Sequence, residues 1–116
     1  MTPRQITVAI VDDEADMRES VAQWLALSGF AAETFESAEA ALDRLDRGFA
    51  GVVITDIKMP GMGGMALLRK LLGMDTSLPV IVITGHGDVP MAVEAMRLGA
   101  YDFIEKPFDP ERLTDL

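Results

Sequence analysis

Short apolar runs recur along the chain, and stretches of helical spacing separate them. The runs are rich in Val and Ile, as expected of strands that a sheet buries on both faces. We expect strands at residues 6–11, 31–35, 50–54, 79–83 and 101–104. Between them we expect helices at 15–28, from 38 to near 48, at 64–74 and at 91–99. This alternation favours one parallel sheet with helices on both faces.

Glycines and capping residues mark where these helices begin and end. Gly29 stands where a left-handed residue ends the first helix, and Ser37 and Asp88 can each cap a helix N-terminus. Asp109 followed by Pro110 starts a further helix. The sequence ends about two turns later, and a helix that short is marginal. We therefore expect a truncated last helix, and a chain cut from a longer protein with another domain beyond it.

Five strands joined in this way commonly take the doubly wound, flavodoxin-like order 2-1-3-4-5. The 116 residues fit a single domain that is long enough to bury a core. In such sheets, ligands bind at the carboxyl ends of the strands, next to the switch point between the first and third strands. Side chains that follow these two strands are therefore the first candidates for a functional site.

The composition excludes several classes of protein. The chain has no cysteine, so disulfides and thiolate metal sites are excluded. The formal net charge is −9, and because phosphate backbones repel so acidic a domain, we expect no direct binding to nucleic acid. The apolar runs are too short to span a bilayer, and the first residues, MTPRQ, lack the plan of a signal peptide. We expect a cytoplasmic protein without membrane contact.

Three carboxylates follow the two strands that flank the switch point. Asp12 and Asp13 come directly after the first strand, and Asp56 comes after the third. We expect them to meet in one crevice, where their mutual repulsion requires raised pKa values or a cation. Oxygen ligands without His or Cys favour Mg²⁺. The alternative is that they are ordinary loop acids near helix N-termini, as Glu14 and Asp16 can be.

The fourth and fifth strands are followed by groups of a different kind. Thr84 ends the fourth strand, and Lys106 follows the fifth. A hydroxyl, an ammonium group and a divalent cation around a carboxylate form a site for a phosphoryl group. Asp56 can then act as a nucleophile and form an acyl phosphate. Taken alone, Thr84 is an ordinary strand-end residue and Lys106 an ordinary surface charge, so the interpretation depends on all these residues converging.

The segments VDDE, TDIKMPGMGG, ITGHG and AYDFIEKPF, in this order, resemble the receiver domain of bacterial two-component response regulators. The likeness covers essentially the whole chain and is strongest to regulators of nitrogen metabolism, C4-dicarboxylate transport and nitrogen fixation. It implies a phosphoacceptor switch that assists its own phosphorylation and dephosphorylation, not a turnover enzyme. It also implies a sensor histidine kinase as donor, a homodimer through helix four, strand five and helix five, and a transcriptional output domain in the full-length protein.

The resemblance assigns roles to single residues. Asp56 corresponds to the phosphorylated aspartate. The Mg²⁺ ligands it implies are Asp12, Asp13, Asp56 and the backbone carbonyl of Lys58. Thr84 and Lys106 correspond to the residues that contact the phosphoryl group, and Thr84 and Phe103 to the pair that switches conformation. The chain departs from the family at Gly63, where Asp is common, and two successive glycines there could loosen the start of the third helix.

Other interpretations stay open. A Mg²⁺-dependent phosphohydrolase on a related sheet would place a second aspartate two residues after the nucleophile, where this chain has Lys58. A flavodoxin-type module needs a hydroxyl- and glycine-rich phosphate loop after the first strand, where DDEAD would repel a phosphate. A third alternative is an interaction domain of receiver fold that works without phosphorylation. The single histidine, His86, is expected to be an exposed loop residue.

Overall fold

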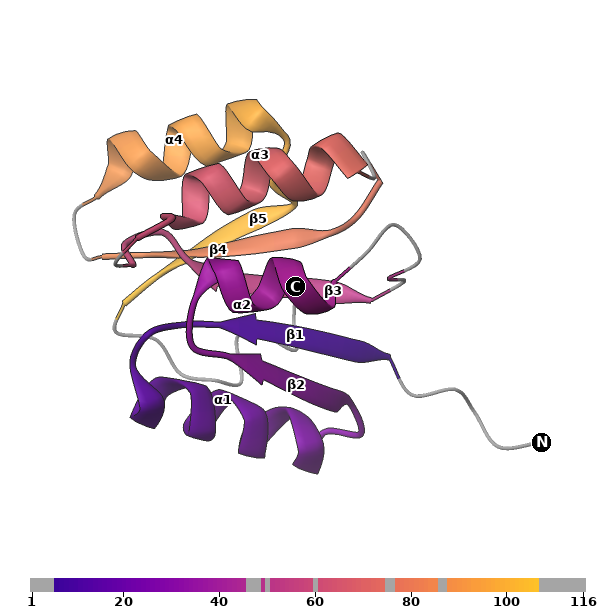
Figure 1. Ribbon diagram of the computed structural model, residues 1–116. Helices are drawn as coiled ribbons and strands as arrows, with labels where there is room; N and C mark the ends of the chain where they lie inside the picture. The colour runs from indigo at the N-terminus through magenta and orange to yellow at the C-terminus, as the bar shows by residue number, and fades with distance from the viewer. Residues whose placement is uncertain are drawn as a thin grey trace.

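The computed structural model describes residues 6–45, 49, 51–59, 61–74, 77–85 and 88–106. In this part of the chain, a single sheet is built from β1 (Thr7–Val11), β2 (Ala31–Phe35), β3 (Val52–Asp56), β4 (Val80–Thr84) and β5 (Asp102–Glu105). The strand order is β2-β1-β3-β4-β5, and every neighbouring pair is parallel (Figure 1). The predicted fold class and strand order are confirmed.

The described helices are α1 (Ala15–Leu27), α2 (Ala38–Arg44), α3 (Gly64–Met74) and α4 (Val89–Leu98). Helix α1 packs on one face of the sheet, and α2, α3 and α4 pack on the other (Figure 1). The predicted helix start at Asp109-Pro110 lies outside the described residues, as do the truncated last helix and His86. None of the described helices is long and apolar enough to cross a membrane.

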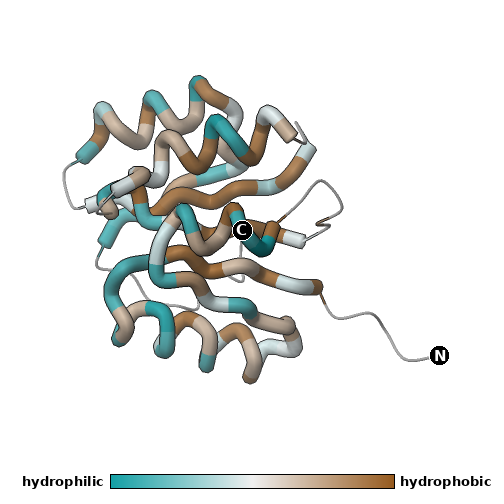
Figure 2. Tube along the Cα trace, in the orientation of Figure 1, coloured by the Kyte–Doolittle hydropathy of each residue, from teal (hydrophilic) through white to brown (hydrophobic). Residues whose placement is uncertain are grey.

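Successive residues of each central strand contribute to two different cores. In β1, Ala9 and Val11 belong to the core shared with α2 and α3, whereas Val8 and Ile10 belong to the core under α1. All four are at most 3% exposed, because strand side chains alternate between the faces and helices cover both. Figure 2 shows the result as apolar strands inside and hydrophilic residues toward the loops that follow them.

Strand β3 ends two residues later than predicted, at Val52–Asp56 instead of 50–54. The register pairs Asp56 with Ile83, and the N–H of Ile57 donates to the carbonyl of Ile83 at 3.0 Å. The prediction followed apolar character alone, but hydrogen bonds to the neighbouring strand extend the ladder into polar residues. Asp56 is therefore the last residue of a strand and is held by a regular backbone.

Local capping rules account for some of the helix ends. Ser37 caps α2 because its Oγ accepts a hydrogen bond from the N–H of Ala40 at 3.1 Å. Gly29 and Gly99 follow α1 and α4 with φ of 93° and 112°, in the left-handed region that glycine tolerates. Asp88 is the N-cap residue of α4, but its side chain makes no capping hydrogen bond. The predicted position of the cap is therefore confirmed, but its hydrogen bond is absent, because the ψ of Asp88 is 54°, far from the extended 161° of Ser37.

Candidate functional site

Three carboxylates lie together at the carboxyl ends of β1 and β3, which are neighbours in the sheet. Asp12 is fully buried, Asp56 is 6% exposed, and Asp13 is exposed. Each offers a carboxylate oxygen, and these oxygens all lie within 4.8 Å of one another. The parallel topology thus brings together acids that are far apart in sequence, as predicted from the switch point.

Asp12 is held by its own loop and left incompletely satisfied. Its Oδ1 accepts a hydrogen bond from the N–H of Glu14 at 2.9 Å, and its backbone carbonyl accepts one from Arg18 at 2.7 Å. Its Oδ2 is buried and has no hydrogen-bond partner among the described residues. Burial, followed by the charges of Asp56 and Glu14, raises the pKa of Asp12 above its ordinary value, although the Glu14 N–H and Lys106 oppose the shift.

Lys106 reaches these acids from the end of β5. Its Nζ donates to Oδ2 of Asp56 at 2.7 Å and lies 3.4 Å from Oε1 of Glu14 and 3.9 Å from Oδ2 of Asp12. Burial by itself lowers the pKa of Lys106, but the hydrogen bond to Asp56 and the three negative charges outweigh it and raise that pKa. Lys106 is therefore an ammonium group placed directly on the carboxylate of Asp56.

Asp56 is fixed from both sides. While Oδ2 accepts from Lys106, Oδ1 accepts from the backbone N–H of Lys58 at 3.1 Å. The start of α3 presses on the same backbone, because the N–H of Gly64 donates to the carbonyl of Ile57 at 2.8 Å. A Cβ at Gly64 would overlap the carbonyl oxygen of Asp56. The carboxylate therefore points in a set direction, and small residues let α3 approach it.

Thr84 and Phe103 occupy different environments. Thr84 ends β4 and is 1% exposed, and its Oγ1 is buried without a hydrogen-bond partner among the described residues. Its carbonyl accepts from the N–H of Lys106 at 2.8 Å, which ties the ends of β4 and β5 together. Phe103 is 37% exposed on β5. The structure therefore places Thr84 inside the carboxyl end of the sheet and Phe103 at the surface.

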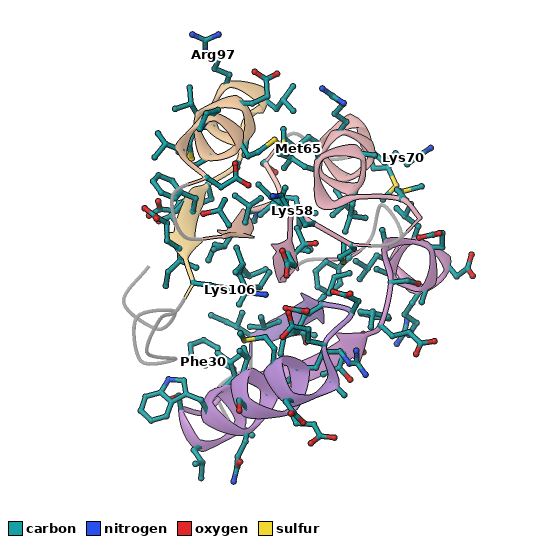
Figure 3. The ribbon with its side chains drawn as sticks, turned by 90° about the vertical axis from the view of Figure 1, so that its left-hand side faces the viewer. Phe30, Lys58, Met65, Lys70, Arg97 and Lys106 are labelled. Carbon is teal, nitrogen blue, oxygen red and sulfur yellow. The ribbon has the colours of Figure 1, made fainter. Side chains whose placement is uncertain are left out.

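The sequence did not reveal three features of this site. The ammonium of Lys58 lies 3.4 Å from Oδ2 of Asp88, and Glu14 contacts Lys106. Figure 3 shows Lys58 on the side of α3 and α4 and Lys106 on the side of α1 and β5. The third feature is the close packing at Gly64, for which the pair of glycines was the only signal. Ion pairs between loops leave no pattern in a sequence.

The donor set fits a hard divalent cation. All three groups are carboxylates, and the buried Oδ2 of Asp12 lacks a hydrogen-bond donor among the described residues. Mg²⁺ and Ca²⁺ take oxygen ligands of this kind, and Mg²⁺ typically binds one or two carboxylates together with a phosphate. With Lys106 beside them, these acids can accommodate a cation and a phosphoryl group at the same carboxylate.

Residues 8–116 match the family model for the response regulator receiver domain. The chain is 54% identical over 108 residues to the C4-dicarboxylate transport transcriptional regulatory protein DctD of Rhizobium meliloti, covering 93% of this chain and 24% of that protein. It is 55% identical over 103 residues to the transcriptional regulatory protein FixJ of the same species, covering 89% of this chain and 50% of that protein. It therefore spans about a quarter to a half of these relatives.

Solved structures agree with this match. The crystal structure of FixJ-N superposes with a TM-score of 0.88 at 50% identity, covering 97% of this chain and 90% of that chain. A receiver domain protein from Clostridium thermocellum gives a TM-score of 0.90 at 31% identity, with 95% and 89% covered. From the sequence match over nearly its full length and the agreement in fold, the chain belongs to the response regulator receiver domain family.

Proposed function

We propose that this chain is the phosphoacceptor domain of a two-component response regulator that controls transcription, with Asp56 accepting a phosphoryl group from the phosphohistidine of a sensor kinase. The observation that carries the proposal is the hydrogen bond of 2.7 Å from Lys106 to Asp56, beside the acids Asp12 and Asp13. Homologous proteins named as transcriptional regulators support the wider role.

In the proposed transfer, an oxygen of Asp56 forms a bond to phosphorus while the phosphorus–nitrogen bond of the phosphohistidine breaks. The imidazole leaves and takes up a proton. The ammonium of Lys106 already donates to Oδ2 of Asp56. It would stabilise the negative charge as that charge moves from the carboxylate to the phosphoryl oxygens. Mg²⁺ held by Asp12, Asp13, Asp56 and the backbone carbonyl of Lys58 would neutralise the remaining phosphoryl charge.

The hydroxyl of Thr84 is the group through which we propose that the new charge is sensed. It is buried without a hydrogen-bond partner among the described residues. It could therefore donate to a phosphoryl oxygen within its reach without breaking an existing hydrogen bond. Phe103 would follow into the space that Thr84 leaves. The phosphorylated state would thereby alter the outer surface of β5 and α4.

That surface already has the character of an interface. Large apolar side chains are exposed there on α4, on β5 and directly before β5: Val89, Val93, Met96, Tyr101 and Phe103. A cluster of this kind is costly to leave in water and is typical of a contact site. We propose that it forms a homodimer together with the segment that follows β5, and that the dimer controls an output domain of the full-length, cytoplasmic protein.

The proposed domain is a switch and not a turnover enzyme, although it assists its own phosphorylation and dephosphorylation. A phosphohydrolase would need an acid or base beside the acyl phosphate. The residue two positions after Asp56 is instead Lys58, whose ammonium pairs with Asp88. Slow hydrolysis is therefore expected, so that the phosphorylated state persists long enough to signal.

The intact mass after incubation with Mg²⁺ and acetyl phosphate tests this proposal. We expect a gain of one phosphoryl group, which should be lost in Asp56→Asn and without metal. Asp43→Asn, which removes an exposed carboxylate from α2, is the matched control and should be phosphorylated normally. Folded protein that gains no mass under any condition would refute the proposal and favour an interaction domain that works without phosphorylation.

A further inference from the structure

The loop between β4 and α4 is bounded by two buried polar atoms without a hydrogen-bond partner among the described residues. One is Oγ1 of Thr84 and the other is Oδ2 of Asp88. Buried polar atoms are rarely left in this state. The Thr84 hydroxyl has a proposed role in sensing the phosphoryl group, but Asp88 has none so far. Its contacts indicate a second element of the conformational switch.

Asp88 stands at the N-cap position of α4 and does not act as a cap. Pro90 occupies the second helical position and has no N–H, so the only donor that a capping side chain could reach is the N–H of Met91. Aspartate is among the best capping residues, and Ser37 makes the equivalent bond to the third helical N–H in α2. The first turn of α4 is therefore held in a form that lacks an available stabilising bond.

Lys58 is the group that holds Asp88 in this position. Its Nζ lies 3.4 Å from Oδ2 of Asp88, whose side chain is only 19% exposed. The distance makes an ion pair, but the geometry does not make a hydrogen bond. The backbone N–H of Lys58 meanwhile donates to Oδ1 of Asp56. A single residue thus contacts the acceptor carboxylate through its backbone and the start of α4 through its side chain.

We propose that Lys58 and Asp88 form a latch that couples phosphorylation of Asp56 to capping of α4. A phosphoryl group on Asp56 carries about −1.5 to −2 charges and competes with Asp88 for the ammonium of Lys58. Once released, Asp88 rotates to accept the N–H of Met91 and caps the helix. The latch rests on the proposed function, and it makes Lys58 and Asp88 positioning residues for the α4 surface.

Beryllofluoride with Mg²⁺, which mimics a phosphoryl group on a carboxylate, provides the first test. Asp88→Asn keeps a side chain that can cap but removes the charge that binds Lys58. We expect it to bind beryllofluoride about two- to fivefold more tightly than the wild type, the range that a partly exposed ion pair supports. In a Lys58→Met background the same substitution should change nothing. Glu94→Gln, which removes an exposed charge from α4, is the matched control and should bind as the wild type does.

Hydrogen exchange at the Met91 amide provides a readout that general electrostatics would not move. In the wild type, this amide should become protected when beryllofluoride binds. In Asp88→Asn it should be protected already, and in Asp88→Ala it should stay unprotected in both states. The amide of Ala40, capped by Ser37, should be equally protected in every variant and shows that the fold is intact.

The outcomes separate the latch from the function on which it rests. A wild type that binds no beryllofluoride would overturn the proposed function and the latch together. If the wild type binds beryllofluoride, the latch alone would be overturned by an Asp88→Asn variant that keeps Lys58 and has the same affinity as the wild type. An unchanged Met91 exchange rate on binding would also overturn the latch alone.

Discussion

Replacing Asp12 by Asn should stabilise the metal-free protein at neutral pH, although it removes a residue of the proposed metal site. Asp12 is fully buried. Its oxygen 3.9 Å from Lys106 gains about 4 kcal/mol at an effective dielectric constant of about 20. Repulsion from Asp56, across at most 4.8 Å, costs at least about 3.5 kcal/mol on the same scale. Since the attraction to Lys106 and the repulsion from Asp56 nearly cancel, the lost hydration of the carboxylate decides whether its charge stabilises or destabilises the fold.

The hydration penalty of a buried ion is several kcal/mol, and the hydrogen bond from Glu14 recovers part of it. Asparagine keeps that bond through its carbonyl oxygen. We therefore expect the free energy of unfolding of Asp12→Asn to exceed that of the wild type by about 1–3 kcal/mol, or about 4–12 °C in Tm. Asp13→Asn, at the exposed neighbour, should change it by no more than about 0.5 kcal/mol.

The pH dependence follows from the raised pKa of Asp12. Burial first, and then the charges of Asp56 and Glu14, lift this pKa above its ordinary 3.8, so the folded protein releases the proton at a higher pH than the unfolded chain does. The wild type then loses stability as the pH rises through the folded-state pKa. The gap between wild type and Asp12→Asn should therefore be complete above that pKa and should close as the pH falls toward 3.8.

Urea unfolding in chelator, repeated over a series of pH values, measures this gap. Excess Mg²⁺ should reverse the order, because a ligand at roughly a thousand times its dissociation constant stabilises the wild type by about 4.1 kcal/mol, more than the expected gap, while the variant lacks one carboxylate for it. If Asp12→Asn were less stable than the wild type in chelator at neutral pH, the attraction to Lys106 would outweigh burial and the reasoning would be wrong.

Further substitutions test the packing around the site by urea unfolding. Gly64→Ala should cost 2 kcal/mol or more, about the scale of overpacking, because its Cβ would meet backbone atoms of Asp56 and Ile57, whereas Gly73→Ala in the same helix has open space and should gain about 0.5–1 kcal/mol. A loss at both positions would contradict the packing argument. Ser37→Ala should cost about 1 kcal/mol because it removes the cap of α2. Thr84→Val should leave the unphosphorylated protein as stable as the wild type or up to about 1 kcal/mol more stable, since it replaces a buried hydroxyl that has no partner; a clear loss would mean that the hydroxyl is already hydrogen-bonded.

The fold could be predicted because its cause is repeated along the chain. Helices cover both faces of the sheet, so the interiors of β1, β3 and β4 are almost entirely apolar. The same topology predicts that the acids after β1 and β3 meet, since parallel neighbours end at the same edge. Only the boundaries shifted, as at β3, where hydrogen bonding continues beyond the apolar residues as far as Asp56.

Side-chain partnerships across loops could not be predicted in the same way. The pairing of Lys58 with Asp88 depends on the course of two loops and on the ψ of Asp88. The sequence rule for Asp before a helix predicted a cap, and the structure has an ion pair instead. Similarly, the exposure of Phe103 depends on what covers β5, which no local pattern sets. Where two local preferences compete, the tertiary contact decides.

The unsatisfied atoms at this site give the resting state a definite energetic direction. Oδ2 of Asp12, Oγ1 of Thr84 and Oδ2 of Asp88 all lack a hydrogen bond among the described residues. In the proposed switch, each would be satisfied by a different event: a cation beside Asp12, a phosphoryl oxygen at Thr84, and a helix N–H at Asp88. Because a buried polar atom left unpaired costs about 1–3 kcal/mol, satisfying Asp12 and Thr84 would shift a two-state equilibrium by several kcal/mol, whereas Asp88 would exchange its ion pair with Lys58 for a capping hydrogen bond. In the proposed switch, the resting fold is destabilised at the positions that phosphorylation would repair, which is why a chemical change at Asp56 would alter the surface of α4.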